Sequence, residues 1–192
     1  MESIGTKEKK IIAEIINTGY RQAATSFSML TGQNIRTENA GFDICTNHDY
    51  LVDNFDHLKN LTIVQTDVIG QLGGSSYLIF NEEEKRAVSH MSLAASGGSI
   101  SIDDTAILKE IDNIISASVI TELSNALNVN IYGDVPHLFE TEDIKEFYSA
   151  MKEGDGDYYL LARSNFIFEN HVMISPIFIW KMDKKFLSMI NA

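Results

Sequence analysis

Hydrophobic and polar positions follow a helical period in two long stretches of the sequence. In "LKEIDNIISASVITELSNALN", Leu108 to Asn128, apolar residues recur every three or four positions, as they do in an amphipathic helix. The stretch "AEIINTGYRQAATSFSMLTGQN", which begins at Ala13, has the same pattern. We therefore predict two long helices, each with one apolar face.

The two helical stretches are related by an internal repeat. When Glu14 is aligned with Glu110, seven of 22 positions are identical. Each stretch is followed by two β-rich runs joined by a turn, within Leu61 to Phe80 and within Tyr158 to Trp180, where Asn170 is near the expected turn. Apolar alternation and the enrichment in β-branched and aromatic residues predict a hairpin in both places.

Each predicted hairpin leads into a shorter helix, with Asn81 and Asp183 as the expected N-caps. The order helix–strand–hairpin–helix thus occurs twice. The predicted seam, the segment that joins the two copies, is "ASGGSISIDD", residues 95–104. We predict an α+β fold in which residues 1–192 form a single domain of two pseudo-symmetric halves, 1–96 and 97–192. The halves should share one largely antiparallel sheet with the long helices packed on it, because each half alone would expose a whole sheet face or edge.

Each predicted long helix has an acid and an amide three residues apart on its polar face. The pairs are Glu14 with Asn17 and Glu110 with Asn113. Residues at i and i+3 are neighbours on a helix surface, so both side chains should point away from the core. One such pair is ordinary on a solvated helix face, but two at equivalent places of a repeat indicate a functional site.

The residues around these pairs separate the repeated feature from coincidence. A third pair, Glu122 with Asn125, has no counterpart in the first half, and we interpret it as chance. The second polar face continues with the short side chains of Ala117, Thr121 and Ser124. Short side chains let another protein lie close to the helix, so we expect a docking surface that presents an acid and an amide.

Composition narrows the class of partner. The net charge of −12 disfavours nucleic acid and anionic membranes, whose phosphates would be repelled. Cys45 is the single cysteine and the five histidines lack ligand spacing, so neither a disulfide framework nor a metal site is expected. The sequence shows no apolar signal core and no segment suited to span a bilayer, which indicates a cytoplasmic protein.

The spacing of Glu110, Asn113 and Pro136 matches a known pattern, Glu-x-x-Asn followed by 22 residues and Pro. On this pattern the second half resembles the CheC/CheX/FliY family of chemotaxis phosphatases, and the first half carries the same helix signature. Two complete pairs in one chain make it similar to the CheC-like members. FliM shares the fold of this family but lacks the acid and amide pairs.

The resemblance implies a phosphatase that hydrolyses the aspartyl phosphate of a CheY-type response regulator. It implies that Glu14 and Glu110 engage the active-site lysine of the regulator, and that Asn17 and Asn113 orient the attacking water. An amide has a donor and an acceptor, so it can hold a water in line without taking a proton. No cofactor of its own is expected, because the Mg²⁺ that neutralises the phosphoryl charge belongs to the partner regulator.

The sequence also departs from the family pattern. Lys10 and Ala106 stand where Asp or Ser is frequent, and Ile16 and Asp112 replace the Gly that usually precedes the Asn. Ile16 should pack harmlessly, whereas Asp112 lies towards the apolar side and needs a polar partner or an exposed edge. Ala40 stands at the first half's equivalent of the Pro, so the first site matches less completely.

These departures keep two alternatives open. One is a non-catalytic binding module for phosphorylated regulator or for a CheD-type deamidase. The other is a flagellar-switch component, which the two intact pairs disfavour.

Overall fold

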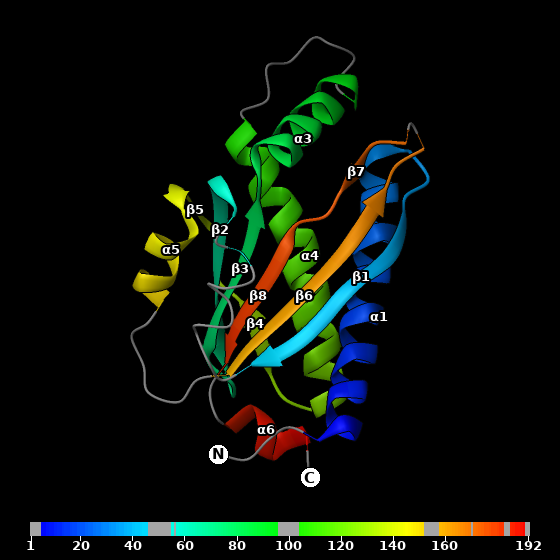
Figure 1. Cartoon of the computed structure of the whole chain (residues 1–192). Coiled ribbons are helices and arrows are strands. Elements are labelled where there is room, and N and C mark those ends of the chain that lie inside the picture. The colour runs from blue at the N-terminus through cyan, green and yellow to red at the C-terminus, as the bar shows by residue number, and fades with distance from the viewer. Residues whose placement is uncertain are drawn as a thin grey trace.

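An eight-stranded sheet forms the centre of the molecule, in the order β1-β6-β8-β3-β2-β4, with β5 also paired to β2 and β7 to β6 (Figure 1). The computed structural model describes residues 5–45, 55, 57–95, 104–151, 158–169, 171–182 and 185–190. All of its strand pairings are antiparallel. The strands are β1 (Arg36–Cys45), β2 (Lys59–Gly70), β3 (Gly74–Phe80), β4 (Ile131–Gly133), β5 (His137–Asp143), β6 (Tyr158–Ile167), β7 (Met173–Ile174) and β8 (Ile177–Met182).

Two long helices, α1 and α4, lie side by side along one face of this sheet, as Figure 1 shows. They correspond to the two amphipathic stretches that the sequence predicts. The helices are α1 (Thr6–Thr31), α3 (Glu82–Ala95), α4 (Asp104–Leu127), α5 (Ile144–Met151) and α6 (Lys185–Ile190). The predicted α+β fold class is therefore confirmed, including the duplicated order of its elements.

Both predicted hairpins are present. Strands β2 and β3 pair through the register Gln65↔Tyr77, and β6 and β8 through Leu161↔Ile179. Neighbouring residues of a strand point to opposite faces, so alternating apolar residues can serve two hydrophobic cores. The expected turn residue Asn170 lies outside the described residues, as does most of the predicted seam between the halves.

The sheet interleaves the two halves of the sequence. Strand β1 of the first half pairs with β6 of the second, while β4 and β5 of the second half pair with β2 of the first. The central contact, β3 with β8, also joins the halves. Each half thus supplies an edge strand to the other half's hairpin. The assignment of 1–96 and 97–192 as pseudo-symmetric halves stays a prediction, and this strand order agrees with it.

A capping box starts the helix that follows the first hairpin. The Glu84 backbone N–H donates to Asn81 Oδ1 at 2.9 Å, and the Asn81 N–H donates to Glu84 Oε2 at 3.0 Å. The expected N-cap role of Asn81 is thereby seen directly, while Asp183 lies outside the described residues. At the start of α1, residues 7–10 are helical and Lys9 forms an ion pair with Asp43 of β1.

The hydrophobic core is divided by the sheet. The larger cluster lies between the sheet and helices α1 and α4, and the smaller one lies under α5 on the opposite face. Helix α5 was not predicted, although its buried residues have helical spacing that could have revealed it. They are Ile144, Phe147, Tyr148 and Met151.

The two long helices cross at a glycine. A Cβ added to Gly19 would lie 2.8 Å from the Cα of Val119, closer than side chains normally approach a backbone. Gly19 therefore lets α1 and α4 come into backbone contact. Next to this crossing, Gln22 Nε2 donates a 2.6 Å hydrogen bond to Glu122 Oε1.

Candidate functional site

Both predicted acid and amide pairs lie on the outer faces of the long helices. On α1, Glu14 is exposed and Asn17 is half-buried, while Ile12 and Ile16 on the opposite side are buried. Farther along α1, the apolar side chain of Leu30 is 61% exposed. Leu30 is the next-to-last residue of the helix, where the chain leaves the core.

The second pair is more open than the first. On α4, Glu110 and Asn113 are both exposed, whereas Leu108 and Ile115 are buried against the sheet. Among the residues that the structure describes, no hydrogen bond or ion pair engages the side chain of either glutamate or either asparagine of the two pairs. The acid and the amide of each pair are thus free to contact a partner.

The third Glu-x-x-Asn pair is different. Glu122 accepts a hydrogen bond from Gln22 of the neighbouring helix, so its carboxylate contributes to the packing of α1 against α4. Asn125 is exposed. This arrangement fits the interpretation of Glu122 and Asn125 as a coincidence of sequence.

The two functional pairs are separated in space. Helices α1 and α4 run in opposite directions, as the colour gradient in Figure 1 shows, and they cross near Gly19 and Val119. Each pair precedes the crossing point along its own helix, so the pairs lie on opposite sides of it. Glu14 and Asn17 therefore form one candidate site, and Glu110 and Asn113 form another.

The side chains that follow each pair differ between the sites. In the first site, Arg21 Nη2 donates to Thr18 Oγ1 at 2.8 Å, and the Thr18 hydroxyl donates to the Glu14 carbonyl. The corresponding position in the second site is Ala117, which is exposed and adds no charge. Of the short side chains expected on this face, Ala117 and Thr121 are exposed and Ser124 is half-buried.

Asp112, the neighbour of Asn113, has the polar partners that its position requires. Its carboxylate is fully buried and accepts hydrogen bonds from Thr66 Oγ1 at 2.6 Å and from Ser116 Oγ at 2.7 Å. Burial raises the pKa of the Asp112 carboxyl to about 6, while the two hydroxyl donors act in the opposite direction. Ser116 is one helical turn away, whereas no local sequence signal links Thr66 on β2 to this site.

Pro136 lies at an interruption of the sheet beside this network. Strands β4 and β5 both pair with β2, through Gly133↔Val68 and His137↔Gln65, so the residues between them stand opposite Thr66 and Asp67. Pro136 is buried there. Thr66 thus connects the interruption that contains Pro136 to the helical turn of the second pair.

The first half has a similar irregularity without the same connection. The register of β1 against β6 shifts between Asn39 and Gly41, around the position that corresponds to Pro136. Ser164 is opposite this shift, and its hydroxyl donates to the Glu38 carbonyl at 3.3 Å. Ile16, buried on α1, occupies the place of Asp112. No side-chain hydrogen bond therefore links α1 to β6 here among the described residues.

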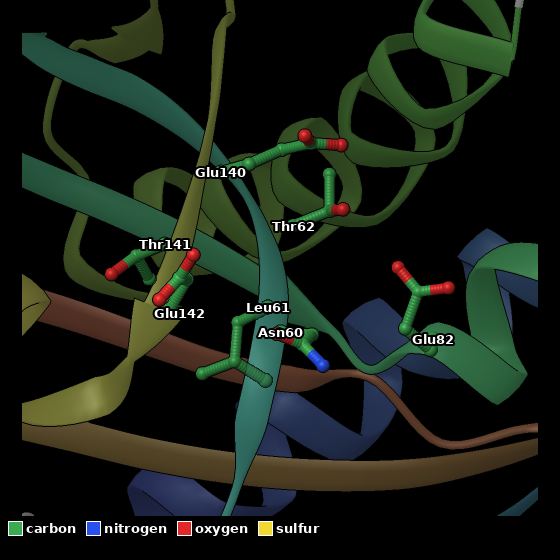
Figure 2. Close-up of a pocket in the computed structure, with 7 residues that line it drawn as sticks. All are labelled: Asn60, Leu61, Thr62, Glu82, Glu140, Thr141 and Glu142. Atoms are coloured by element: carbon green, nitrogen blue, oxygen red, sulfur yellow. The ribbon is translucent and has the colours of Figure 1, made fainter.

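An open pocket of about 410 Å³ lies elsewhere on the molecule (Figure 2). Its lining includes Glu82 of α3 together with Glu140 and Glu142 of β5, and it contains none of the four predicted site residues. Glu140 forms an ion pair with Lys85. Within the described part of the chain, no group of three or more His, Cys, Asp or Glu side chains is placed to hold a metal ion.

Comparison with known proteins identifies the fold. No protein-family model matches the sequence, and no curated protein matches it. Solved structures that this chain resembles belong to chemotaxis and flagellar-switch proteins, so this chain has the CheC/CheX/FliY fold. The resemblance inferred from the paired residues and Pro136 is confirmed at the level of the fold.

Three of these structures illustrate how similar the solved structures are to this chain. FliY of Thermotoga maritima is similar with a TM-score of 0.74 and 16% identity, over 99% of this chain and 96% of that chain. A chain of the FliG–FliM complex of H. pylori has a TM-score of 0.67 and 12% identity, over 96% and 100%. CheX of Desulfovibrio desulfuricans has a TM-score of 0.54 and 18% identity, over 88% and 99%.

The helices give one further finding about location. None of those that the structure describes is long and apolar enough to cross a membrane.

Proposed function

We propose that this protein is a phosphatase that hydrolyses the aspartyl phosphate of a CheY-type response regulator. The observation that carries the proposal is the repetition of an unengaged acid and amide, Glu14 with Asn17 and Glu110 with Asn113, on the outer faces of two helices. The likeness to FliY and CheX supports it, since both share this fold.

The geometry suits in-line attack by water on a phosphoryl group brought by the partner. The carboxylate of Glu14 or Glu110 would pair with a lysine beside the regulator's phosphorylated aspartate, which docks the two proteins. The neighbouring amide, on the same helical turn, would hold the water through its donor and its acceptor. The water oxygen bonds to phosphorus as the acyl phosphate bond breaks, which releases inorganic phosphate and restores the aspartate carboxylate.

Charge explains why the two residue types are not interchangeable. A carboxylate at the amide's position would repel the phosphoryl oxygens, whereas a neutral amide would not. Phosphoryl transfer depends mainly on positioning and charge stabilisation, and the regulator's own Mg²⁺ would supply the latter. The proposed contribution of this chain is therefore docking and water placement.

The test measures the decay of a phosphorylated CheY-type regulator with and without this protein. Replacing both amides, Asn17→Ala with Asn113→Ala, should lower the acceleration by roughly 10²-fold, because a misplaced water loses the benefit of orientation. Each single variant reports the contribution of the other site. The matched control is Asn125→Ala, which removes an exposed amide from the coincidental pair and should leave the rate unchanged.

An unchanged rate in the double variant would refute the catalytic assignment.

A second candidate function is favoured by the likeness to a chain of the FliG–FliM complex. It is a binding protein of the chemotaxis or flagellar machinery that captures phosphorylated regulator, or a CheD-type deamidase, without turnover. Tight association in a pull-down beside an unaccelerated decay would support this candidate.

A further inference from the structure

Asp112 is a buried carboxylate that the proposed reaction does not use. It is 0% exposed, yet both of its hydrogen-bond partners, Thr66 and Ser116, are neutral hydroxyls. Removing a carboxylate from water is costly even when it accepts hydrogen bonds. A buried carboxylate on the inner face of a helix is therefore expected only where it has a structural or functional role.

The two hydrogen bonds of Asp112 join it to different elements, one to its own helix and one to the sheet. The bond from Ser116 stays within α4 and holds the carboxylate along the helix, one turn away. The bond from Thr66 comes from β2 and ties α4 to the sheet. A tie on the side of a helix limits its rotation about its own axis. The next residue is Asn113, so the tie sets the direction in which that amide projects.

Over the residues that the structure describes, the first candidate site, Glu14 with Asn17, has no hydrogen bond from a strand to the residue beside its amide. The two sites can therefore be compared within one molecule. Ile16 is buried in place of Asp112, and Tyr20 stands in place of Ser116. The buried hydroxyl of Ser164, opposite the irregularity of β1, bonds to a strand carbonyl instead of to a helix. A polar contact of α1 with the sheet on this side is the Lys9–Asp43 ion pair, two helical turns before Asn17. Beside Asn17 itself, buried apolar residues orient α1.

We propose that Asp112 is the positioning residue of the second site: through its hydrogen bonds to Thr66 and Ser116 it fixes α4 against β2 and so orients Asn113, the next residue. This inference rests on the proposed phosphatase function. It makes the two sites unequal, because a buried hydrogen bond to the sheet lies at the residue next to Asn113, whereas the apolar Ile16 lies next to Asn17.

The experiment isolates the second site in an Asn17→Ala background and measures kcat and KM for regulator dephosphorylation. Asp112→Ile, which copies the first half, and Thr66→Val, which removes the donor on β2, should each lower kcat about tenfold with KM within about twofold, because orientation and not docking is lost. The conservative variants Asp112→Asn and Thr66→Ser keep polar partners and should retain kcat within about threefold of the background.

The matched control is Ser164→Ala, which removes the corresponding buried hydroxyl of the first half and should leave second-site kcat unchanged. A second readout needs no regulator: amide hydrogen exchange at residues 110–113 should accelerate in Thr66→Val and not in Ser164→Ala. Far-UV circular dichroism of each variant separates a loss of kcat from a loss of folded protein.

The outcomes distinguish the two proposals. If the protein with both pairs intact fails to accelerate decay, the proposed function is wrong, and hydrogen exchange still decides whether Thr66 holds this turn of α4. If that protein is active but folded Asp112→Ile or Thr66→Val keeps the background kcat, the positioning role is wrong. Unchanged exchange at residues 110–113 in Thr66→Val would overturn it equally.

Discussion

At the scale of single residues, Asp112 couples the stability of the protein to pH. Burial raises the pKa of its carboxyl to about 6 from an ordinary value of 3.8, and the hydrogen bonds from Thr66 and Ser116 reduce this effect without cancelling it. The folded state therefore holds the proton more tightly than the unfolded state does. Stability from this group is complete below the unfolded pKa, declines from about pH 4 and is lost above about pH 6.

The residue-scale prediction compares the protein with Asp112→Asn. Across this pH range the free energy of unfolding should fall by about 3 kcal/mol more in the protein than in the variant, which has no proton to lose. Urea unfolding at a series of pH values measures the difference, in which contributions from other groups cancel. Parallel profiles for the two proteins would contradict the assignment of this pH dependence to Asp112.

At the scale of elements, the contact between α1 and α4 sets how the two candidate sites face solvent. The helices touch at Gly19, where a Cβ would lie 2.8 Å from the Val119 Cα. Because the close atom belongs to the backbone, a side-chain rotation cannot relieve the contact. A larger residue must push the helices apart and so change the directions of both pairs.

The element-scale prediction is that Gly19→Ala destabilises the protein. Alanine favours a helix over glycine by about 1 kcal/mol, but overpacking typically costs about 1–3 kcal/mol. We expect a lower free energy of unfolding and a lower phosphatase rate, measured by thermal unfolding and by regulator decay. Thr25→Ala, on the exposed face of the same helix, is the control and should change stability by less than about 0.5 kcal/mol. A more stable Gly19→Ala protein would show that the crossing tolerates a methyl group.

At the scale of the whole molecule, the sheet makes the two halves depend on each other. The hairpin of each half pairs along one side with strands of the other half. Strand β1 of the first half pairs with β6 of the second, and β4 and β5 of the second half pair with β2 of the first. A separated half would expose these strand edges together with the apolar face beneath its long helix. Unpaired edges of this kind favour aggregation over folding.

The whole-molecule prediction is that residues 1–96 and 97–192, produced separately, do not fold. Neither fragment should show a cooperative thermal transition by circular dichroism, whereas the full chain should. Refolding the fragments together should restore part of the transition, since the missing strands are then available. A cooperative transition in either fragment alone would mean that the halves are independent units.

The periodicity of the sequence was sufficient to predict the helices and hairpins whose signals lie within a few neighbouring residues. The apolar spacing in α1 and α4, the two hairpins and the Asn81 cap are each encoded within a few neighbouring residues, so they could be predicted. Helix α5 was missed even though Ile144, Phe147, Tyr148 and Met151 carry a helical spacing, because eight residues make a weak periodic signal. The pairing of β1 with β6 has no local signature.

The sequence by itself determined the four candidate residues, Glu14, Asn17, Glu110 and Asn113, because an i, i+3 pair on an amphipathic helix can be placed on the outer face without knowing the fold. The sequence also showed that the first site matches the family pattern less completely, but only the tertiary structure decided which contacts hold each site. Asp112 was a polar residue without a visible partner, and its partner Thr66 is on a strand far away in sequence. Hydrogen bonds between distant segments depend on how the sheet and helices pack, and that packing is a property of the whole chain.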